Sequence, residues 1–218
     1  PEVVVPRFGG WLALDHDGQR LAALANTKRG LEVYDLGGDV TQPSFVVRDA
    51  SAPYTNESFG FSPDGKELAT FVGPGRLRRI NARDGSKIAE HDQDGADWIR
   101  LRYLRDGSAL AVVSLKPARL RLIHLSDGRI EDFPLPLHPT AAALSPDGTT
   151  IACADRDGHI QLVDRVSGVA RSIGSQSGTV WSLDFSPVDS GLLMVSTRAD
   201  GVMLFDLDNG EICHRWTV

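Results

Sequence analysis

The sequence predicts an all-β protein of about five four-stranded antiparallel units. A turn that ends in glycine recurs five times, and its glycines are 47, 42, 41 and 43 residues apart, at positions 18, 65, 107, 148 and 191. A second glycine turn follows in each unit, at residues 37–38, 84–85, 127–128, 167–168 and 209–210. Between the turns apolar residues alternate with a period of two, and no segment holds a helical period over about ten residues. These observations predict short strands joined by hairpins.

The unit is clearest in residues 180–210. Residues 180–185 alternate with a period of two, and a segment containing Pro187 and Gly191 then breaks the run. Proline presets φ and glycine accepts positive φ, so such a segment turns the chain. Further strands are expected at 192–196, 202–207 and 212–218, with turns at 200–201 and 208–210. Four strands joined in this way form one antiparallel meander.

The other four units follow the same plan. Their strands are expected at 11–14, 21–25, 31–36 and 45–47; at 59–61, 68–72, 77–80 and 87–90; at 99–104, 109–114, 119–125 and 129–133; and at 141–144, 151–154, 160–163 and 169–173. A repeat of about 43 residues with four strands has the size of a β-propeller blade. We place the blades at 7–49, 54–92, 97–135, 139–174 and 178–218.

Residues 1–218 are therefore expected to form a single β-propeller domain or a segment of a larger propeller. Five blades are enough to close a ring. The chain begins at Pro1 rather than Met, and a β-branched run at 2–5 precedes the first unit, either as the outer strand of a further blade or as a strand that closes the ring. These features favour a segment of a six- to eight-bladed propeller within a longer chain, and the closed ring stays open as the alternative.

The repeats resemble those of the WD-repeat (tryptophan–aspartate) β-propellers. The resemblance rests on Leu-Ser-Pro-Asp-Gly at 144–148, Phe-Ser-Pro-Asp-Gly at 61–65, the segment 157–164, and Val-Trp-Ser at 180–182 followed by 200–206. The repeats are degenerate, because the family's Trp-Asp pair is replaced by Tyr34-Asp35, Ile80-Asn81, Ile123-His124, Val163-Asp164 and Phe205-Asp206. The family's Gly-His pair is also missing, so we expect blades held mostly by apolar packing. Seven blades, the commonest number in the family, would need roughly 300 residues at this period.

The resemblance implies a non-catalytic scaffold for protein–protein interaction, or a sensor or regulatory module of a larger signalling or defence protein. The alternative is the propeller arm of a peptidase- or lactonase-like hydrolase that gates or binds substrate. The six histidines form no HxH or HExxH pair, and the sequence contains neither a Gly-x-Ser-x-Gly elbow nor a glycine-rich phosphate loop. We therefore predict no catalytic, cofactor-binding or metal-binding residues. Domains before or after this segment would decide between the two readings.

Composition sets limits on partners and location. The 218 residues are 41% hydrophobic and 24% charged, as in ordinary globular proteins, and the net charge of −6 argues against general nucleic-acid binding. The sequence has no run of about 18 apolar residues that would predict a membrane span, and no basic-then-apolar leader. We expect a cytoplasmic protein whose partners include other domains of its own parent chain.

Two residue types are expected inside the blades. Cys153 and Cys213 lie on expected strands with apolar neighbours, and free cysteines are commonly buried, so both are interpreted as small core residues. The four tryptophans are interpreted as core or turn anchors: Trp11, Trp98, Trp181 and Trp216.

Arginine is concentrated in the second and third units. Residues 76–121 hold eleven Lys/Arg against six Asp/Glu, although the whole chain is acidic. The arginines lie on three expected strands, as Arg76, Arg78 and Arg79, as Arg100 and Arg102, and as Arg119 and Arg121. Arg-Leu-Arg alternation places two guanidinium groups on one strand face, and each can donate two parallel hydrogen bonds to a carboxylate. Two interpretations stay open: a docking patch for an acidic partner segment or an anionic ligand, and a solvated surface whose arginines pair with Asp94, Asp97 and Asp184.

Other partner-binding residues are expected in the connections between blades and between second and third strands. Candidates by position are Lys28, Arg29, Pro74, Arg76, Trp98, Arg156 and Arg198. The acidic stretch 91–97 has part of the spacing of a calcium-binding loop. However, Tyr103 stands where such a loop requires a glutamate, so an acidic surface turn is expected.

Overall fold

The fold consists of strands and turns. In the computed structural model, residues 12–24, 30–48, 59–72, 75–94, 98–135 and 139–216 are described, apart from the side chain of Ile99. These ranges contain twenty β-strands and no helix, so no described segment is an apolar helix long enough to span a bilayer. The run at 2–5 and Trp11 lie outside the described residues.

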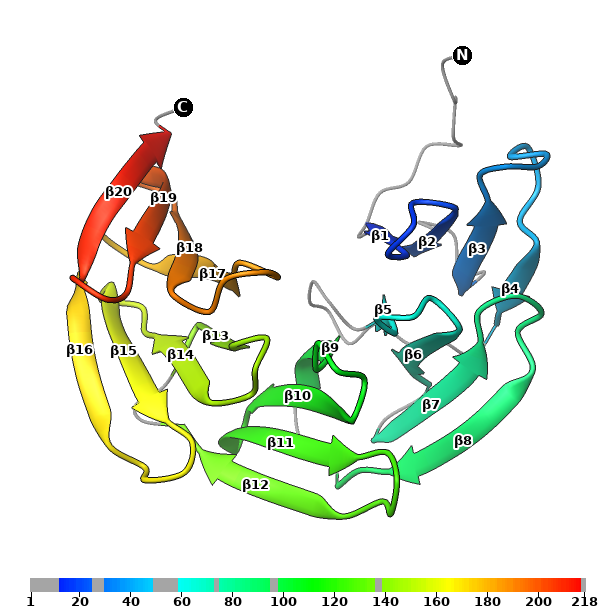
Figure 1. Ribbon diagram of the computed structural model, residues 1–218, viewed down its shortest axis with the longest axis horizontal. Coiled ribbons are helices and arrows are strands. Elements are labelled where there is room, and N and C mark those ends of the chain that lie inside the picture. The colour runs from blue at the N-terminus through cyan, green and yellow to red at the C-terminus, as the bar shows by residue number, and fades with distance from the viewer. Residues whose placement is uncertain are drawn as a thin grey trace. The chain divides into compact units, whose positions relative to one another are not determined.

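The strands form five four-stranded antiparallel sheets, and each strand pairs with its neighbours in sequence (Figure 1). Sheet 1 contains β1 (Leu12–Leu14), β2 (Arg20–Leu24), β3 (Leu31–Asp35) and β4 (Phe45–Val47). Sheet 2 contains β5 (Phe59–Phe61), β6 (Glu67–Phe71), β7 (Arg76–Asn81) and β8 (Lys87–Asp92). Sheet 3 contains β9 (Trp98–Tyr103), β10 (Ala109–Leu115), β11 (Ala118–His124) and β12 (Ile130–Pro134).

Sheet 4 contains β13 (Ala141–Leu144), β14 (Thr150–Ala154), β15 (His159–Asp164) and β16 (Ala170–Ser175). Sheet 5 contains β17 (Val180–Phe185), β18 (Leu192–Thr197), β19 (Gly201–Asp206) and β20 (Glu211–Trp216). The predicted all-β fold of five four-stranded antiparallel units is therefore confirmed.

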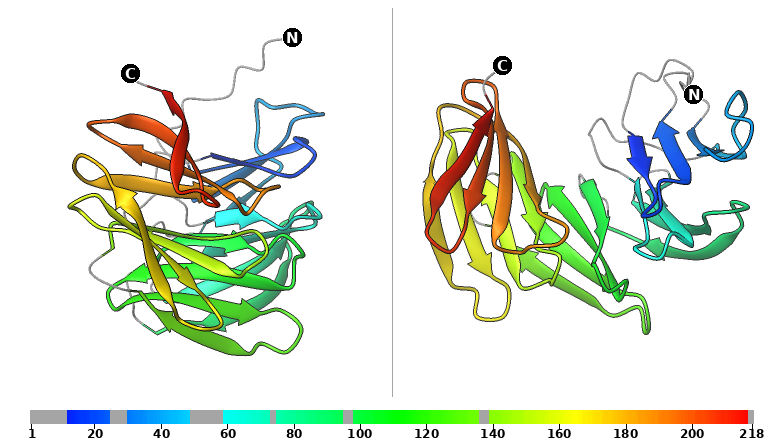
Figure 2. Two further views of the ribbon diagram at one scale, coloured as in Figure 1. Left: turned by 60° about the vertical axis from the view of Figure 1, so that its left-hand side comes forward. Right: turned by 45° about the horizontal axis from the view of Figure 1, so that its top comes forward.

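The chain divides into two compact units, residues 1–116 with 123–128 and residues 117–122 with 129–218. Sheets 1 and 2 belong to the first unit, sheets 4 and 5 to the second, and the division falls within sheet 3. Within the second unit, sheet 4 (yellow-green) and sheet 5 (orange to red) lie side by side in both views of Figure 2.

Equivalent turns take the same conformation in successive sheets. Gly65, Gly107 and Gly148 have φ of 67°, 72° and 72°, a left-handed conformation that side-chain-bearing residues rarely adopt. Each glycine N–H donates a 2.9 Å hydrogen bond to the carbonyl three residues earlier. The glycine period in the sequence therefore reports a repeated structure.

The serine that opens the turn is a buried polar anchor. Ser145 is fully buried, its Oγ donates to Asp147 Oδ1 at 2.6 Å, and it accepts the Thr150 N–H at 2.9 Å. Burial alone would raise the pKa of Asp147, but hydrogen bonds from Ser145 and Thr149 lower it to about 2. In sheet 2 the same turn lowers the pKa of Asp64 to about 2, chiefly through the hydroxyl of Ser62.

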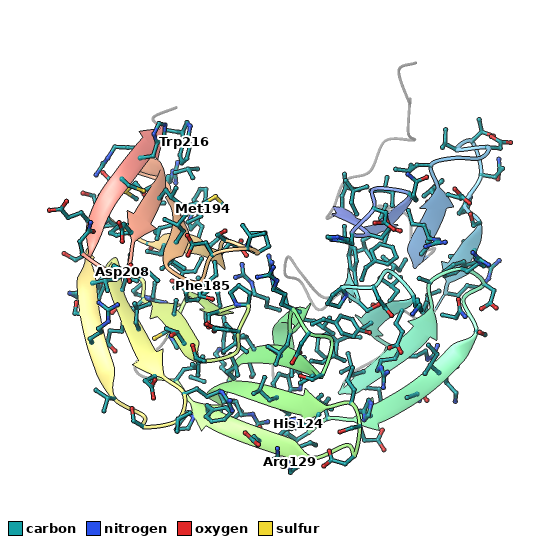
Figure 3. The ribbon with its side chains drawn as sticks, in the orientation of Figure 1. His124, Arg129, Phe185, Met194, Asp208 and Trp216 are labelled. Atoms are coloured by element: carbon teal, nitrogen blue, oxygen red, sulfur yellow. The ribbon has the colours of Figure 1, made fainter. Side chains whose placement is uncertain are left out.

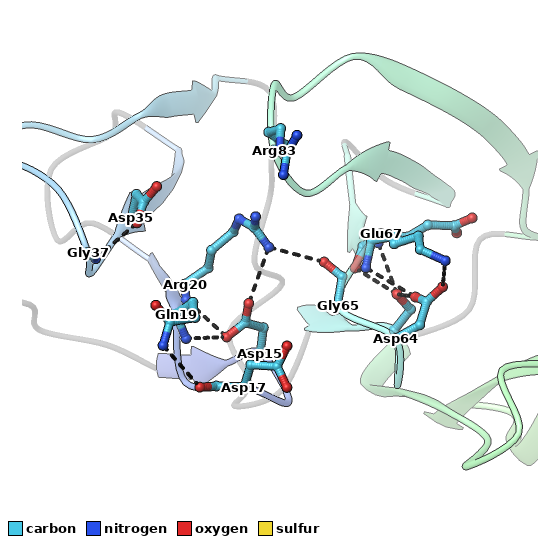
Figure 4. A network of polar contacts seen from close by, with 12 residues as sticks. Asp15, Asp17, Gln19, Arg20, Asp35, Gly37, Asp64, Gly65, Glu67 and Arg83 are labelled. Atoms are coloured by element: carbon cyan, nitrogen blue, oxygen red, sulfur yellow. Dashed lines mark hydrogen bonds and ion pairs between the residues drawn. The ribbon is translucent and has the colours of Figure 1, made fainter.

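Sheet 1 varies this turn and uses it to contact sheet 2. Asp15 takes the place of the serine, and its Oδ1 accepts the amides of Gln19 at 2.7 Å and Arg20 at 2.9 Å. The Arg20 guanidinium bonds Asp15 Oδ2 at 3.3 Å and reaches the Gly65 carbonyl in sheet 2 at 3.4 Å (Figure 4). This arginine therefore ties the first turn of one sheet to the first turn of the next.

Apolar side chains fill the space between neighbouring sheets. In the second unit, Ile160 and Leu162 of sheet 4 pack in one cluster with Leu193, Val195 and Phe205 of sheet 5, and all five are at most 3% exposed. Burying one such side chain stabilises the fold by about 1.5–3 kcal/mol. The first unit has two clusters of the same kind, one between sheets 1 and 2 and one between sheets 2 and 3.

Several expectations about single residues are wrong. Cys153 is buried as predicted, but Cys213 is exposed because it lies on β20, the outer strand of sheet 5. Trp181 and Trp216 are 60% and 48% exposed, so neither is a core anchor. The stretch 91–97 is only partly a surface turn, since β8 continues to Asp92 and the next residue is buried.

We predict that Ser145→Ala lowers the free energy of unfolding by about 1–2 kcal/mol, because the partly buried Thr150 N–H loses its acceptor. Urea denaturation measures this change, and Ser126→Ala, at an exposed turn position, is the control that leaves stability unchanged. Equal effects of the two substitutions would contradict the anchoring role.

We also predict that the turn carboxylates contribute to acid unfolding. The folded-state pKa of Asp64 and of Asp147, about 2, lies below the ordinary value of 3.8, so the unfolded chain binds more protons between these values. The resulting stability is present above about pH 4 and is lost as the pH falls toward 2. As the pH falls from about 4 toward 2, the urea midpoint of the double variant Asp64→Asn/Asp147→Asn should therefore decrease less steeply than that of the natural chain. Parallel curves for the two proteins would refute the lowered pKa values of these carboxylates.

Candidate functional site

The candidate site lies at one end of sheets 4 and 5, where three connecting segments meet. They are the β14–β15 turn (155–158), the β16–β17 connection (176–179) and the β18–β19 turn (198–200). Hydrogen bonds join all three. The Gln176 N–H donates to the Gly158 carbonyl at 2.9 Å, and the Thr179 hydroxyl donates to the Arg156 carbonyl at 3.0 Å. The Ser177 N–H donates to Asp200 Oδ2 at 2.8 Å.

Asp155 holds the first of these turns. Its Oδ1 accepts the Asp157 N–H at 2.9 Å and the His159 N–H at 3.0 Å, and its Oδ2 lies 3.0 Å from His159 Nδ1. Burial would raise the pKa of Asp155, but these hydrogen bonds lower it overall. Asp155, Asp157 and His159 are also a group, among the described residues, whose ligand atoms lie within 4.8 Å of one another, as a metal site requires. Both Asp155 oxygens already accept hydrogen bonds within the hairpin.

Asp200 holds the third turn. Its N–H donates to Thr197 Oγ1 at 2.9 Å, and its Oδ1 lies 3.7 Å from the guanidinium of Arg215 on β20. Together with the bond from Ser177, these contacts fix the turn that carries Arg198.

A bulge in β17 presents Trp181 at this end of the sheet. The register passes from Val180–Thr197 directly to Ser182–Ser196, which leaves Trp181 without a partner on β18. Bulges of this kind redirect a side chain out of the regular alternation. The indole is consequently 60% exposed although its neighbours Val180 and Leu183 are fully buried.

Trp181 and Arg198 line a hollow of about 560 Å³. The rest of the lining comes from Ser177, Gly178, Thr179 and Ala199. Arg198 is exposed, so the hollow combines an aromatic face, a guanidinium and short polar side chains on hydrogen-bonded turns. Such a surface can bind an apolar or aromatic side chain together with a carboxylate.

The structure brings some of the predicted residues to this site and places others elsewhere. Arg198 lines the hollow, and Arg156 is exposed on the adjoining turn. Lys28, Arg29 and Pro74 lie outside the described residues. Trp98 is 2% exposed, packs in the core of the first unit, and donates its indole N–H to the Asp94 carbonyl at 3.2 Å.

Trp181 was not among the site residues that the sequence predicted. The alternation of residues 180–185 places Trp181 and Leu183 on one strand face, and only the bulge separates them. The available signal was weak: a tryptophan two residues after the glycine-containing, polar segment 174–179.

The arginines of sheets 2 and 3 are engaged within their own sheets. Arg78 on β7 bonds Glu90 at 2.7 Å on the adjacent strand, and Arg79 makes two 2.8 Å bonds to Glu67. The hydrogen bond from Arg78 lowers the pKa of Glu90. In sheet 3 both Arg119 and Arg121 bond Asp132, and Arg121 does so through two 2.6 Å bonds.

The remaining arginines of the set differ in exposure. Arg76 and Arg102 are exposed, whereas Arg100 is 9% exposed. The ion pairs described above run to Glu90, Glu67 and Asp132 rather than to the expected carboxylates, and Asp97 lies outside the described residues.

A second hollow lies in the first unit beside the Arg79–Glu67 pair. It measures about 430 Å³, and its lining includes Tyr103, Arg105 and Asp106. The Tyr103 hydroxyl bonds Glu67 Oε2 at 3.3 Å, and burial raises the pKa of this phenol. Positively and negatively charged side chains lie close together in this hollow, so it has no clear preference for the charge of a ligand.

Comparisons with known proteins agree with the repeat pattern. A family model described as WD domain, G-beta repeat matches residues 135–164. WD repeat-containing protein SL1-17 of Schistosoma mansoni is 29% identical over 113 residues, which are 51% of this chain and 37% of that protein. The crystallised β-propeller domain of Myceliophteria thermophila Cps50 (Swd1) has a TM-score of 0.68 and 16% identity, over 93% of this chain and 66% of that one. The chain thus spans less than two thirds of the former protein and about two thirds of the latter.

We predict that Gly158→Ala destabilises the protein more than Gly128→Ala. Both glycines have positive φ, +87° and +72°, which costs an alanine about 1 kcal/mol. A Cβ at 158 would also collide with the carbonyl of Gln176 in the connection, whereas a Cβ at 128 would meet nothing within 4 Å. Urea denaturation should therefore show about 1–3 kcal/mol of additional loss for Gly158→Ala; equal losses would contradict the close approach.

Proposed function

Taking the chain as a WD-repeat β-propeller, which the family match, the relative and the structural likeness together support, we propose that it is a non-catalytic scaffold for protein–protein interaction. WD-repeat propellers generally bind protein partners and are typically non-catalytic. The finer proposal is that the end of sheets 4 and 5 is the docking surface, and that the Trp181–Arg198 hollow is its centre.

The hollow carries this proposal because it holds the residue types that dominate binding energy. Tryptophan and arginine are enriched among interface residues whose truncation costs 2 kcal/mol or more. Trp181 is exposed at a bulge of the paired strand β17, and Arg198 is exposed on a turn that hydrogen bonds hold in place, so the backbone around them loses little entropy on docking.

The partner segment is expected to be acidic and to carry an apolar or aromatic side chain. The guanidinium groups of Arg198 and Arg156 suit carboxylates, and the indole of Trp181 suits a flat apolar group. The arginines on β7, β9 and β11 remain a second proposed docking patch for an acidic segment, with Arg76 and Arg102 as its exposed members.

We further propose that this scaffold is the sensing or regulatory arm of a larger signalling or defence protein in the cytoplasm. This proposal is supported by the family resemblance, which indicates a fold and a general role but does not identify a pathway. Other domains of the same polypeptide are expected among its partners.

We predict that Trp181→Ala/Arg198→Glu removes the specific partners captured by the natural chain. Loss of one such anchor costs about 2 kcal/mol, so captured partners should bind roughly 30-fold more weakly or be lost. Quantitative affinity purification and titration of the captured protein measure the effect. Val188→Ala, at another exposed apolar position of sheet 5, is the matched control and should retain all partners.

Arg76→Glu/Arg102→Glu in the same experiment tests the second patch through its exposed members. Loss of partners from this variant alone would move the docking surface to sheets 2 and 3. Unchanged capture by Trp181→Ala/Arg198→Glu would refute the hollow as the docking centre.

A further inference from the structure

An arginine joins the first turns of sheets 1 and 2. Arg20 is the first residue of β2, and its guanidinium donates to Asp15 Oδ2 at 3.3 Å and to the Gly65 carbonyl of sheet 2 at 3.4 Å (Figure 4). The Gly148 carbonyl, at the same turn position of sheet 4, accepts a bond from Arg165 Nε at 2.5 Å. In both sheets a guanidinium group therefore bonds the carbonyl of the turn glycine.

The first turns of sheets 2 and 3 meet in the same way but without such an arginine. A Cβ at Gly107 would contact Pro63 of the preceding turn at 3.9 Å, as a Cβ at Gly65 would contact the turn of sheet 1 at 3.7 Å. The position of Arg20 is taken here by Glu67, the first residue of β6. An ionised carboxylate cannot donate to a carbonyl, and among the described residues no donor bonds the Gly107 carbonyl.

Where the first junction has a guanidinium, the second has the hollow of about 430 Å³, which we call the Gly107 hollow. Glu67 is held at its wall by two 2.8 Å bonds from Arg79 and by the Tyr103 hydroxyl at 3.3 Å. Leu125, which follows His124 at the end of β11 (Figure 3), adds an apolar wall. Such a wall can cover the aliphatic stem of a long charged side chain.

Two charged groups of the sheet 3 turn line the Gly107 hollow without an ion-pair partner among the described residues. Asp106 Oδ1 accepts the N–H and the hydroxyl of Ser108 at 2.9 and 2.7 Å, and these hydrogen bonds lower the pKa of Asp106. Arg105 is exposed and makes no hydrogen bond or ion pair within the described part of the chain. A ligand that carries both a cation and an anion can therefore pair with both groups.

We propose that the Gly107 hollow binds an arginine side chain of a protein partner, in a segment that also carries a carboxylate. The guanidinium takes the place that Arg20 has at the first junction, and donates to the Gly107 carbonyl and the Asp106 carboxylate. Its planar fork suits two acceptors in different directions better than an ammonium group does. Arg105 pairs with the carboxylate of the partner segment. The lining of the Gly107 hollow belongs to the first unit, so the proposal does not rest on docking at the hollow of sheet 5.

Titration of the isotope-labelled chain with the peptide acetyl-Gly-Arg-Asp-Gly-amide, followed by amide NMR shifts, tests the proposal. We expect saturable shifts centred on Asp106 and Gly107 at millimolar peptide. Citrulline has the shape of arginine without its charge, so the citrulline peptide should bind about tenfold more weakly. Absence of shifts at these amides, or equal binding of the two peptides, would overturn the proposal. Free arginine that binds as tightly as the peptide would also overturn it, because the hollow would then bind an amino acid rather than a partner segment.

Variants of the turn test the individual contacts. Asp106→Asn should weaken the arginine peptide about tenfold while the turn is kept, because an asparagine oxygen still accepts the Ser108 N–H. Asp84→Asn is the matched control, since Asp84 accepts the Ser86 N–H in the same way outside the lining of the hollow, and it should leave binding unchanged. Equal losses from the two variants would overturn the contact with Asp106. Arg105→Gln should abolish the preference for aspartate over asparagine in the peptide, and a preference that persists would overturn the carboxylate contact.

Discussion

Apolar packing between successive sheets is the interaction on which the rest of this structure depends. Ile160 and Leu162 of sheet 4 are covered by Phe205 and Leu193 of sheet 5, and each such side chain contributes about 1.5–3 kcal/mol. A turn hydrogen bond contributes about 1 kcal/mol, and exposed ion pairs such as Lys66–Asp64 contribute less. Packing therefore outweighs the polar contacts. This explains how the repeats keep their fold although none of the five positions holds Trp-Asp: two carry a different aromatic residue before the aspartate, and three lack an aromatic–aspartate pair.

The hydrogen-bonded turns hold the loops in fixed positions relative to the packed sheets. Ser145 accepts one backbone N–H and donates to the Asp147 carboxylate, Asp155 accepts two backbone N–H groups, and Asp200 joins a hairpin to the neighbouring connection. Because each anchor is a side chain beside the start or end of a strand, the loops are positioned by the same strands that build the core. The hollow beside Trp181 is thus supported by sheet packing, although apolar residues make up little of its lining.

The sequence predicted the fold well because its signals are local. The alternation of residues 180–185 and the glycines at 65, 107 and 148 specify strands and turns without knowledge of distant contacts. The site was harder to predict because it depends on register. The ion pair of Arg78 with Glu90 exists because these residues are directly opposite on β7 and β8, and the exposure of Trp181 follows from a single bulge. The spacing of residues in the sequence predicts neither which residues pair across strands nor where a bulge occurs.

Sheet 5 carries two surfaces whose chemistry differs, the Trp181–Arg198 hollow and a strand face that includes Met194. Trp181 at the bulge of β17 and Arg198 in the β18–β19 turn combine an aromatic ring with a charge, the residue types that are enriched in docking surfaces. Met194, Leu204 and Val202 stand on paired strands at positions that sheet 4 uses for stacking. The strand face follows the repeat that sheet 4 also carries, whereas the bulge removes Trp181 from the alternation and leaves it 60% exposed.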